Sequence, residues 1–143
     1  AYTTDLKLFD LLNVENSASE STYAQFAWGI DGELIPHQGN AFEVINETAS
    51  SLSINAKATN IHTSDIFYRK DAGTPAVAEK YNCLAVEMEA FALFANAKYL
   101  GKNAATILTV SDVIPTHEQI SADERERALK PMIELALESA IKL

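Results

Sequence analysis

The stretch that most constrains the fold is Cys83–Ala95, an apolar run interrupted by two carboxylates, Glu87 and Glu89. A buried charge costs several kcal/mol unless a partner compensates it, so we expect both carboxylates to have partners. The residues Tyr81–Val86 have the pattern of a buried strand, and Glu87–Leu100 have that of a helix. In open α/β sheets, ligands bind at the carboxyl ends of strands. The sequence therefore predicts an α/β fold with a ligand site at this junction.

The length and charge of the chain exclude several functional classes. The chain has 143 residues, enough for one domain with a hydrophobic core, so we expect a single domain over residues 1–143. Its net charge of −9 argues against a nucleic-acid partner, because neutralising phosphates requires clustered Lys and Arg. No apolar run reaches the roughly 18 residues that a membrane span needs. We expect a cytoplasmic protein with no membrane partner.

The cysteine and the histidines have structural explanations. Cys83 is the single cysteine, which excludes an internal disulfide, and its apolar neighbours suit a buried structural thiol. His37 and His62 are expected to be hydrogen-bonded polar residues, and His117 lies in a loop beside Glu118. No metal-ligand spacing appears, and no Ser, His and Asp can be assigned to a triad. The sequence predicts neither a metal site nor a cofactor.

The first half of the chain predicts two strands, a helix and a further strand. The expected elements are a strand at Leu6–Val14, a short strand at Gln25–Trp28, an amphipathic helix from Asn40 to Leu52, and a strand at Asn55–His62. A polar loop at Glu15–Thr22 is expected after the first strand. Asn40 and Glu43 have the spacing of a capping box at the start of the helix.

The second half has clearer signals. Pro75 suits the first turn of a short helix at Thr74–Lys80, and Gly101 is placed to end the helix Glu87–Leu100. Asn103–Val110 is a largely apolar run, which predicts a strand buried on both faces of a parallel sheet.

A last helix is expected after a loop. Ser121 and Glu124 have capping-box spacing at its start. Pro131 lies inside the helical pattern, where it removes a hydrogen bond and crowds the preceding turn. We therefore expect Asp123–Lys130 to be able to move separately from Met132–Leu143.

Polar residues follow three of the predicted strands. They are Ser64–Asp65 with Phe67, Glu87 with Glu89, and Ser111–Asp112. If the strands are parallel neighbours, their carboxyl ends meet at one edge of the sheet and the three groups converge. Convergence of this kind predicts a small-molecule site.

Each of these groups also has a structural explanation. Glutamates in a first helical turn are stabilised by the helix dipole by about 0.3–1 kcal/mol without any ligand, and Ser-Asp after a strand is often a turn or cap. Phe67 and Tyr68 could be core residues or a stacking face for a flat ligand. Arg125 could pair with a neighbouring glutamate in solvent, or reach back to Asp112.

These motifs together resemble the nucleoside phosphorylase superfamily, most closely the bacterial hexameric purine nucleoside phosphorylases. The matching stretches are Ser64–Tyr68, Val86–Ala90, Thr109–Asp112, and Thr116–Gln119 leading to Glu124–Arg125. The resemblance implies a three-layer αβα sandwich around a mixed, largely parallel sheet, here lacking its N-terminal half. It also implies phosphorolysis of purine ribonucleosides and deoxyribonucleosides in purine salvage, within a homo-oligomer.

The resemblance assigns roles residue by residue. Asp112 would be the general acid that protonates the purine at N7, and Arg125 would position it. The implied substrate-binding residues are Phe67 against the base, Met88 on the sugar, Glu89 on the ribose hydroxyls with Glu87 beside it, and Val86 and Ser111 lining the pocket. Such proton donation typically contributes about 10²–10⁴-fold and requires a carboxyl group with a shifted pKa near neutral pH.

The resemblance begins part-way along the family's longer chains. The implied co-substrate is inorganic phosphate, but the glycine-containing phosphate loop and most phosphate-binding arginines belong to the part that has no counterpart here. We therefore expect the isolated chain to be inactive or nearly so. Two alternatives stay open: a related nucleosidase that uses water in place of phosphate, and a non-catalytic module that binds a nucleoside or oligomerises.

Overall fold

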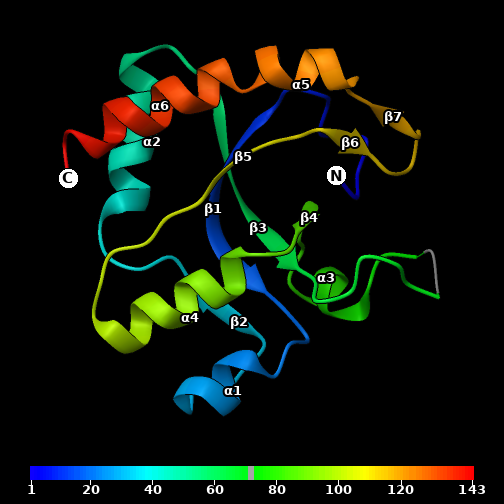
Figure 1. The fold of residues 1–143 in the computed structure, drawn as a ribbon, viewed down its shortest axis with the longest axis vertical. Helices are drawn as coiled ribbons and strands as arrows, with labels where there is room; N and C mark the ends of the chain where they lie inside the picture. Colours follow the sequence, from blue (N-terminus) through cyan, green and yellow to red (C-terminus); the bar gives the residue numbers. More distant parts are fainter. Residues whose placement is uncertain (71–72) are drawn as a thin grey trace.

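The computed structural model describes residues 1–70 and 73–143, and for residues 126–128 the backbone alone. The elements shown in Figure 1 are β1 (Leu11–Ala18), α1 (Tyr23–Trp28), β2 (Leu34–Pro36), α2 (Ala41–Ser51), β3 (Ala56–Thr63), α3 (Ala76–Lys80), β4 (Ala85–Glu87), α4 (Ala90–Leu100), β5 (Ile107–Thr109), β6 (Asp112–Val113), β7 (Glu118–Gln119), α5 (Ala122–Ala128) and α6 (Lys130–Ala140). Among the described residues, no helix is both long enough and apolar enough to span a bilayer.

β1 is the central strand of the main sheet. β3 is parallel to β1, and β4 is parallel to β3. On the other side of β1, β2 pairs antiparallel with its C-terminal half and β5 pairs antiparallel with its N-terminal half. β6 and β7 form a separate antiparallel pair. The predicted mixed sheet with flanking helices is confirmed.

Alternating side chains of β1 point into two different hydrophobic clusters. Leu12 and Val14 are buried with Phe91 and Phe94 of α4, whereas Leu11 is buried with residues of α2 and α6. Figure 1 accordingly shows α2 and α6 side by side on one part of the sheet and α1 beside α4 on another. One strand thus supplies apolar residues to both outer layers, which makes the sheet the middle layer of the sandwich.

The helix that follows β4 forms as predicted, although it begins later. It starts at Ala90, and Gly101 ends it with a φ of 61°, in the left-handed region that glycine adopts without a steric penalty. The apolar residues of the run Cys83–Ala95 are largely buried, and Phe91 and Phe94 lie in the main core.

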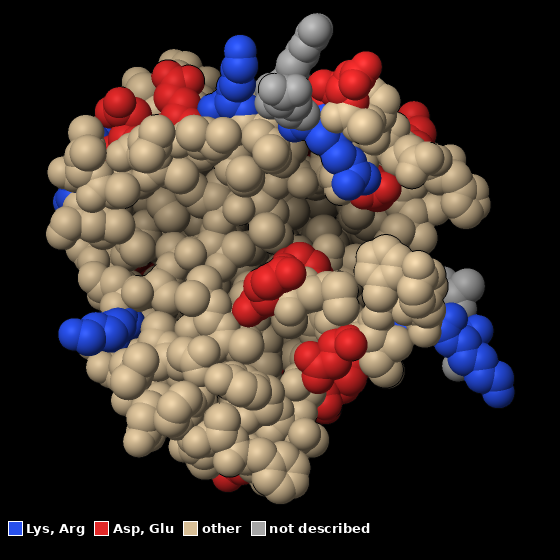
Figure 2. All heavy atoms as spheres, in the orientation of Figure 1, with Lys and Arg blue, Asp and Glu red and all other residues tan. Residues whose placement is uncertain are grey.

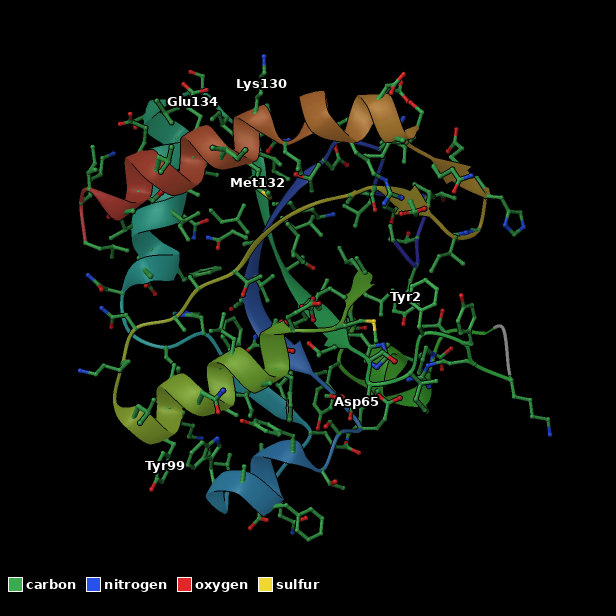
Figure 3. All side chains as sticks on the ribbon, viewed as in Figure 1. Tyr2, Asp65, Tyr99, Lys130, Met132 and Glu134 are labelled. Carbon is green, nitrogen blue, oxygen red and sulfur yellow. The ribbon has the colours of Figure 1, made fainter. Side chains whose placement is uncertain are left out.

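The C-terminal region consists of two helices in place of the single one predicted. They are separated at Leu129, and Pro131 lies in the first turn of α6, where a missing N–H costs nothing. Figure 3 shows Met132 of α6 over the sheet, and its sulfur lies 3.4 Å from the Thr109 hydroxyl. The predicted capping box is confirmed, because the Ser121 N–H donates to Glu124 Oε2 at 2.8 Å and the Glu124 N–H donates to Ser121 Oγ at 3.3 Å.

Several predicted elements of the first half are wrong. Residues Gln25–Trp28 lie in the helix α1, not in a strand, and Trp28 stacks on Tyr99 of α4 at 4.0 Å between ring centroids. This packing against α4 outweighs the local strand preference. β1 begins at Leu11 and continues through polar residues that were expected to form a loop. Asn40 precedes α2 but makes no side-chain capping bond.

The predicted direction of the strand at Asn103–Val110 is also wrong. It shortens to β5, which is antiparallel to β1, and its residues are only partly buried. After α4 the chain returns beside the middle of β1, where the Val14 N–H donates to the Thr106 carbonyl at 3.0 Å, and it runs from there to Thr109 opposite Leu11, so β5 is antiparallel to β1.

The core positions of α4 give a stability prediction. Phe91 is 1% exposed, so Phe91→Ala should lower the free energy of unfolding by about 3–5 kcal/mol, measured by urea denaturation. The matched control is Phe26→Ala, because Phe26 is 84% exposed and its loss should change stability by less than about 0.5 kcal/mol. Equal effects of the two variants would contradict the core assignment.

Candidate active site

A cavity of about 940 Å³ lies between the end of β3, β4 and the segment that runs from β5 to α5. Figure 2 shows the hollow on this face, with acidic side chains beside it. Seven of the eight predicted site residues line it: Phe67, Val86, Glu87, Met88, Ser111, Asp112 and Arg125. The eighth, Glu89, lies outside the lining set. Most of the predicted site residues therefore line one cavity.

These residues converge for a reason that differs from the one expected. Ser64 directly follows β3, and Glu87 is the last residue of the parallel strand β4. Asp112 follows β5, which is antiparallel to β1, so it does not come from the same edge of a parallel sheet. Instead the chain after β5 crosses to the β6–β7 pair, which Figure 1 shows at the upper right, above β4 and α3.

The Asp112 carboxylate faces Arg125. Asp112 Oδ2 lies 3.9 Å from Arg125 Nη2 and accepts a hydrogen bond from Ser111 Oγ. The hairpin of β6 and β7 holds the aspartate, and the Ser121–Glu124 capping box fixes the start of α5, which carries Arg125 in its first turn. Of the alternatives for Arg125, the structure thus favours the reach back to Asp112.

Glu87 is held by the protein at both oxygens. Thr63 Oγ1 donates to Oε1, and the N–H groups of Glu89 and Ala90 donate to Oε2 at 2.8 and 2.7 Å. Burial raises the pKa of the Glu87 carboxyl, and these hydrogen bonds oppose the rise. Glu87 therefore caps the start of α4. The N–H groups at this helix start are partners of the kind that we expected for its carboxylate.

Thr63 connects this cap to the sheet. Its Oγ1 accepts from the Phe91 N–H at 3.0 Å and lies 2.7 Å from Ser17 Oγ, in addition to its bond with Glu87. The Ser19 hydroxyl donates to the Thr63 carbonyl at 2.7 Å. The ends of β1 and β3 and the start of α4 are therefore joined by one buried hydrogen-bond network.

Glu89 and Met88 lie at the exposed end of this junction. Glu89 accepts a bond from the Met88 N–H at 3.1 Å, and its side chain is exposed. Met88 is 41% exposed and lines the cavity. The contact of Glu89 with ribose hydroxyls stays a prediction. The Glu89 carboxylate does not take part in the hydrogen bonds that hold the Glu87 carboxylate to Thr63 and Ala90.

Two aromatic side chains stand at the mouth of the cavity. Phe67 and Tyr68 are 75% and 89% exposed and pack edge to face, with ring centroids 5.0 Å apart. The core alternative for these residues is therefore wrong. Exposed rings lining a cavity offer a stacking surface for a flat ligand.

A second polar network lies at one end of the cavity and was not predicted. His62 is fully buried; its Nδ1 accepts from the Tyr2 hydroxyl at 2.7 Å, and its Nε2–H donates to Glu20 Oε2 at 2.7 Å. Glu20 also accepts from Arg69 Nη2, which donates in addition to Ser64 Oγ at 2.8 Å. The expectation that His62 is a hydrogen-bonded polar residue is confirmed. Figure 3 shows Tyr2 on the side of the N-terminal segment that faces α3.

This network changes the acidity of its members. Burial raises the pKa of the Tyr2 phenol to about 12, which keeps its proton available for His62. Partial burial alone would raise the pKa of Glu20, but the hydrogen bonds from Arg69 and His62 outweigh it and lower the pKa to about 2. Among the described residues, no group of three or more His, Cys, Asp or Glu side chains is arranged to hold a metal ion.

Residues 38–141 match the sequence family described as the Phosphorylase superfamily. The chain belongs to this superfamily. It is 38% identical to the DeoD-type purine nucleoside phosphorylase of Mycoplasma genitalium, in an alignment that covers 100% of the chain and 61% of that relative. The chain thus spans less than two thirds of the length of this phosphorylase superfamily member.

Solved structures share the fold at lower identity. The 5'-methylthioadenosine/S-adenosyl homocysteine nucleosidase of Campylobacter jejuni aligns with 100% of this chain and with 66% of its own length, with a TM-score of 0.84 and 23% identity. The Toxoplasma gondii purine nucleoside phosphorylase in complex with immucillin-H matches 94% of the chain over 56% of its own, with a TM-score of 0.77 and 16% identity. A Helicobacter pylori futalosine hydrolase mutant matches 100% of the chain over 64% of its own, with a TM-score of 0.79 and 17% identity. These likenesses establish the fold.

The two shifted carboxyl groups give opposite acid dependences. Glu20 has a lowered pKa, so its stabilisation is present above its ordinary value of 4.5 and is lost as the pH falls toward 2. Glu87 has a raised pKa, so its ionised form destabilises the fold at neutral pH, and this cost disappears as the pH falls through the raised value and below 4.5.

The measurement is the free energy of unfolding between pH 7 and pH 2.5 for the wild type, Glu20→Gln and Glu87→Gln. On acidification the wild type should lose stability relative to Glu20→Gln, by less than about 1 kcal/mol because solvent screens the half-exposed pair. It should gain stability relative to Glu87→Gln. Changes of the same sign in both comparisons would contradict the two environments described.

Proposed function

We propose that this chain forms the base- and ribose-binding part of a purine nucleoside phosphorylase. The observation that carries the proposal is the Asp112 carboxylate, facing Arg125 across one wall of a cavity that also has Phe67 and Met88 in its lining. A cavity of about 940 Å³ is of the size that small-molecule sites have. The 38% identity with the Mycoplasma genitalium purine nucleoside phosphorylase supports the choice of reaction.

The proposed reaction converts a purine ribonucleoside or deoxyribonucleoside and phosphate into free base and pentose 1-phosphate. Asp112 donates a proton to N7 of the purine while the bond between C1′ and N9 breaks and its electron pair passes to the base. A phosphate oxygen then forms the new bond to C1′. Arg125 lies where its positive charge stabilises the aspartate anion that remains after the proton has left.

The remaining site residues bind and orient the nucleoside. Phe67 stacks on the base and Ser111 holds the Asp112 carboxylate beside it. Met88 and Val86 pack against the sugar. Glu89 binds the ribose hydroxyls, because its carboxylate is exposed whereas both oxygens of Glu87 already accept hydrogen bonds from the protein. Glu87 supports the site from beneath as the cap of α4.

We propose that the isolated chain has little or no phosphorolytic activity. Among the described residues that line the cavity, the cationic side chains are Arg69 and Arg125, and each already faces a carboxylate, that of Glu20 or Asp112. A phosphate dianion needs cationic or N–H donors that are free to bind it. The longer relative has further sequence that this chain does not align with. We assign the phosphate site to that part.

The assembly and the cellular role belong to the same proposal. We take residues 1–143 to be one domain, the C-terminal portion of the phosphorylase fold, acting in purine salvage in the cytoplasm as a homo-oligomer. Large apolar side chains left exposed on α6 and directly after it support an oligomer, namely Ile133, Leu137 and Ile141.

The activity claim is tested by following hypoxanthine release from inosine with and without inorganic phosphate. The isolated chain should show no phosphate-dependent release above background. Release at a rate comparable with that of a full-length relative would contradict the inactivity of the isolated chain. Release that is equally fast without phosphate would favour the second candidate, a nucleosidase, which the likeness to the Campylobacter jejuni nucleosidase fold supports.

The binding claim is tested by titrating the chain with inosine or adenosine in a calorimeter. We expect saturable binding that Phe67→Ala weakens by about 1–3 kcal/mol, the usual value of stacking between a base and an aromatic ring. Phe26→Ala is the matched control, since Phe26 lies on α1 and is not part of the cavity. Lack of saturable binding to the folded wild type would favour the third candidate, a purely structural module.

A further inference from the structure

The segment that carries the two exposed aromatic rings is attached to the sheet through few contacts. Ser64 closes a tight turn, accepting from the Ile66 N–H at 3.2 Å and donating to the Ile66 carbonyl at 2.9 Å. Beyond this turn, Phe67 and Tyr68 are mostly exposed and pack mainly on each other. Their orientation over the cavity therefore depends on the next residue, Arg69.

Arg69 is fixed by a carboxylate that comes from a different part of the chain. Its Nη2 donates to Glu20, which follows β1, and to Ser64 Oγ at 2.8 Å. The second oxygen of Glu20 accepts from the Nε2–H of His62, a side chain with no solvent exposure. His62 in turn is held by Tyr2 at its other ring nitrogen. One oxygen of the Glu20 carboxylate is thus bound to a buried side chain of the core, and the other binds Arg69 of the loop formed by residues 64–70.

We propose that Glu20 is a positioning residue for the nucleoside site, which holds Arg69 and thereby orients the loop of Phe67 and Tyr68 over the cavity. Glu20 itself is not among the residues that line the cavity. It acts through Arg69, which also donates to Ser64 and directly follows Phe67 and Tyr68, the two rings at the mouth of the cavity. That Glu20 restricts the conformation of residues 64–70 is inferred from the hydrogen bonds of Arg69 alone, whereas the effect on ligand affinity rests on the proposed function.

The alternative is an ordinary exposed ion pair that contributes nothing to the site. Glu20 and Arg69 have side chains 38% and 28% exposed, and such pairs are often worth little. The buried histidine distinguishes this pair, because a carboxylate with one oxygen fixed by a fully buried donor has lost most of its conformational freedom before Arg69 binds. An exposed pair such as Lys80 with Glu33 has no comparable anchor.

The first test measures amide hydrogen exchange of residues 64–70 without any ligand. Arg69→Met releases the loop but leaves the bond between Glu20 and His62, so the protein should fold normally and exchange in this segment should be faster by about fivefold. Glu20→Ala should give the same acceleration, and it should also lower the thermal midpoint because the buried His62 N–H loses its acceptor. The matched control is Glu33→Ala, which breaks the exposed pair with Lys80 and should leave exchange in residues 64–70 unchanged.

The second test measures inosine affinity of the same variants by calorimetry at a temperature where all are folded. Arg69→Met and Glu20→Ala should raise the Kd about fivefold, and Ile45→Ala, which destabilises the core beneath α2, should not. Unchanged exchange in residues 64–70 for Arg69→Met and Glu20→Ala would overturn the positioning role, whatever the affinity. Faster exchange with an unchanged Kd would overturn the link to binding. A wild type that binds no inosine would overturn the proposed function and leave the exchange test to decide the role of Glu20 in ordering the loop.

Discussion

The carboxylate of Glu87 joins three elements at the point where β4 turns into α4. It accepts a hydrogen bond from Thr63 at the end of β3 and two more from the N–H groups of Glu89 and Ala90. A carboxylate here satisfies amides that the helix leaves without partners, and these hydrogen bonds offset part of the cost of burial that raises its pKa. Because Met88 lies between these bonded residues, the wall of the cavity is built on this cap.

The two walls of the cavity have different origins. One follows from the parallel pair β3 and β4 and is tied to the core through Thr63 and Ser17. The other belongs to the β6–β7 hairpin and α5, which carry Asp112 and Arg125 and have few residues in the main core. A wall tied to the core and a more loosely attached wall facing it are compatible with closure around a ligand.

The sequence predicted the mixed sheet with flanking helices, and seven of the eight residues predicted for the site line one cavity. Motifs at strand ends indicated these residues, because local spacing alone places Phe67, Met88 and Asp112 just after strands. The direction of β5 could not be predicted, since a short apolar run has the same pattern in parallel and antiparallel sheets. The contacts of Glu20 with His62 and Arg69 join residues far apart in sequence, and no spacing rule indicates them. Helix α1 forms where local preference favoured a strand, because packing on α4 decides its conformation.

The central claim is that the cavity between β4 and α5 is a nucleoside site in which Asp112 meets the base. The most direct test is a crystal structure of the chain with inosine bound. We predict the purine ring against Phe67, with its N7 within hydrogen-bond distance of an Asp112 carboxyl oxygen, and the ribose next to Met88 with its hydroxyls toward Glu89. Inosine bound elsewhere on the protein, or bound in this cavity with N7 directed away from Asp112, would contradict it.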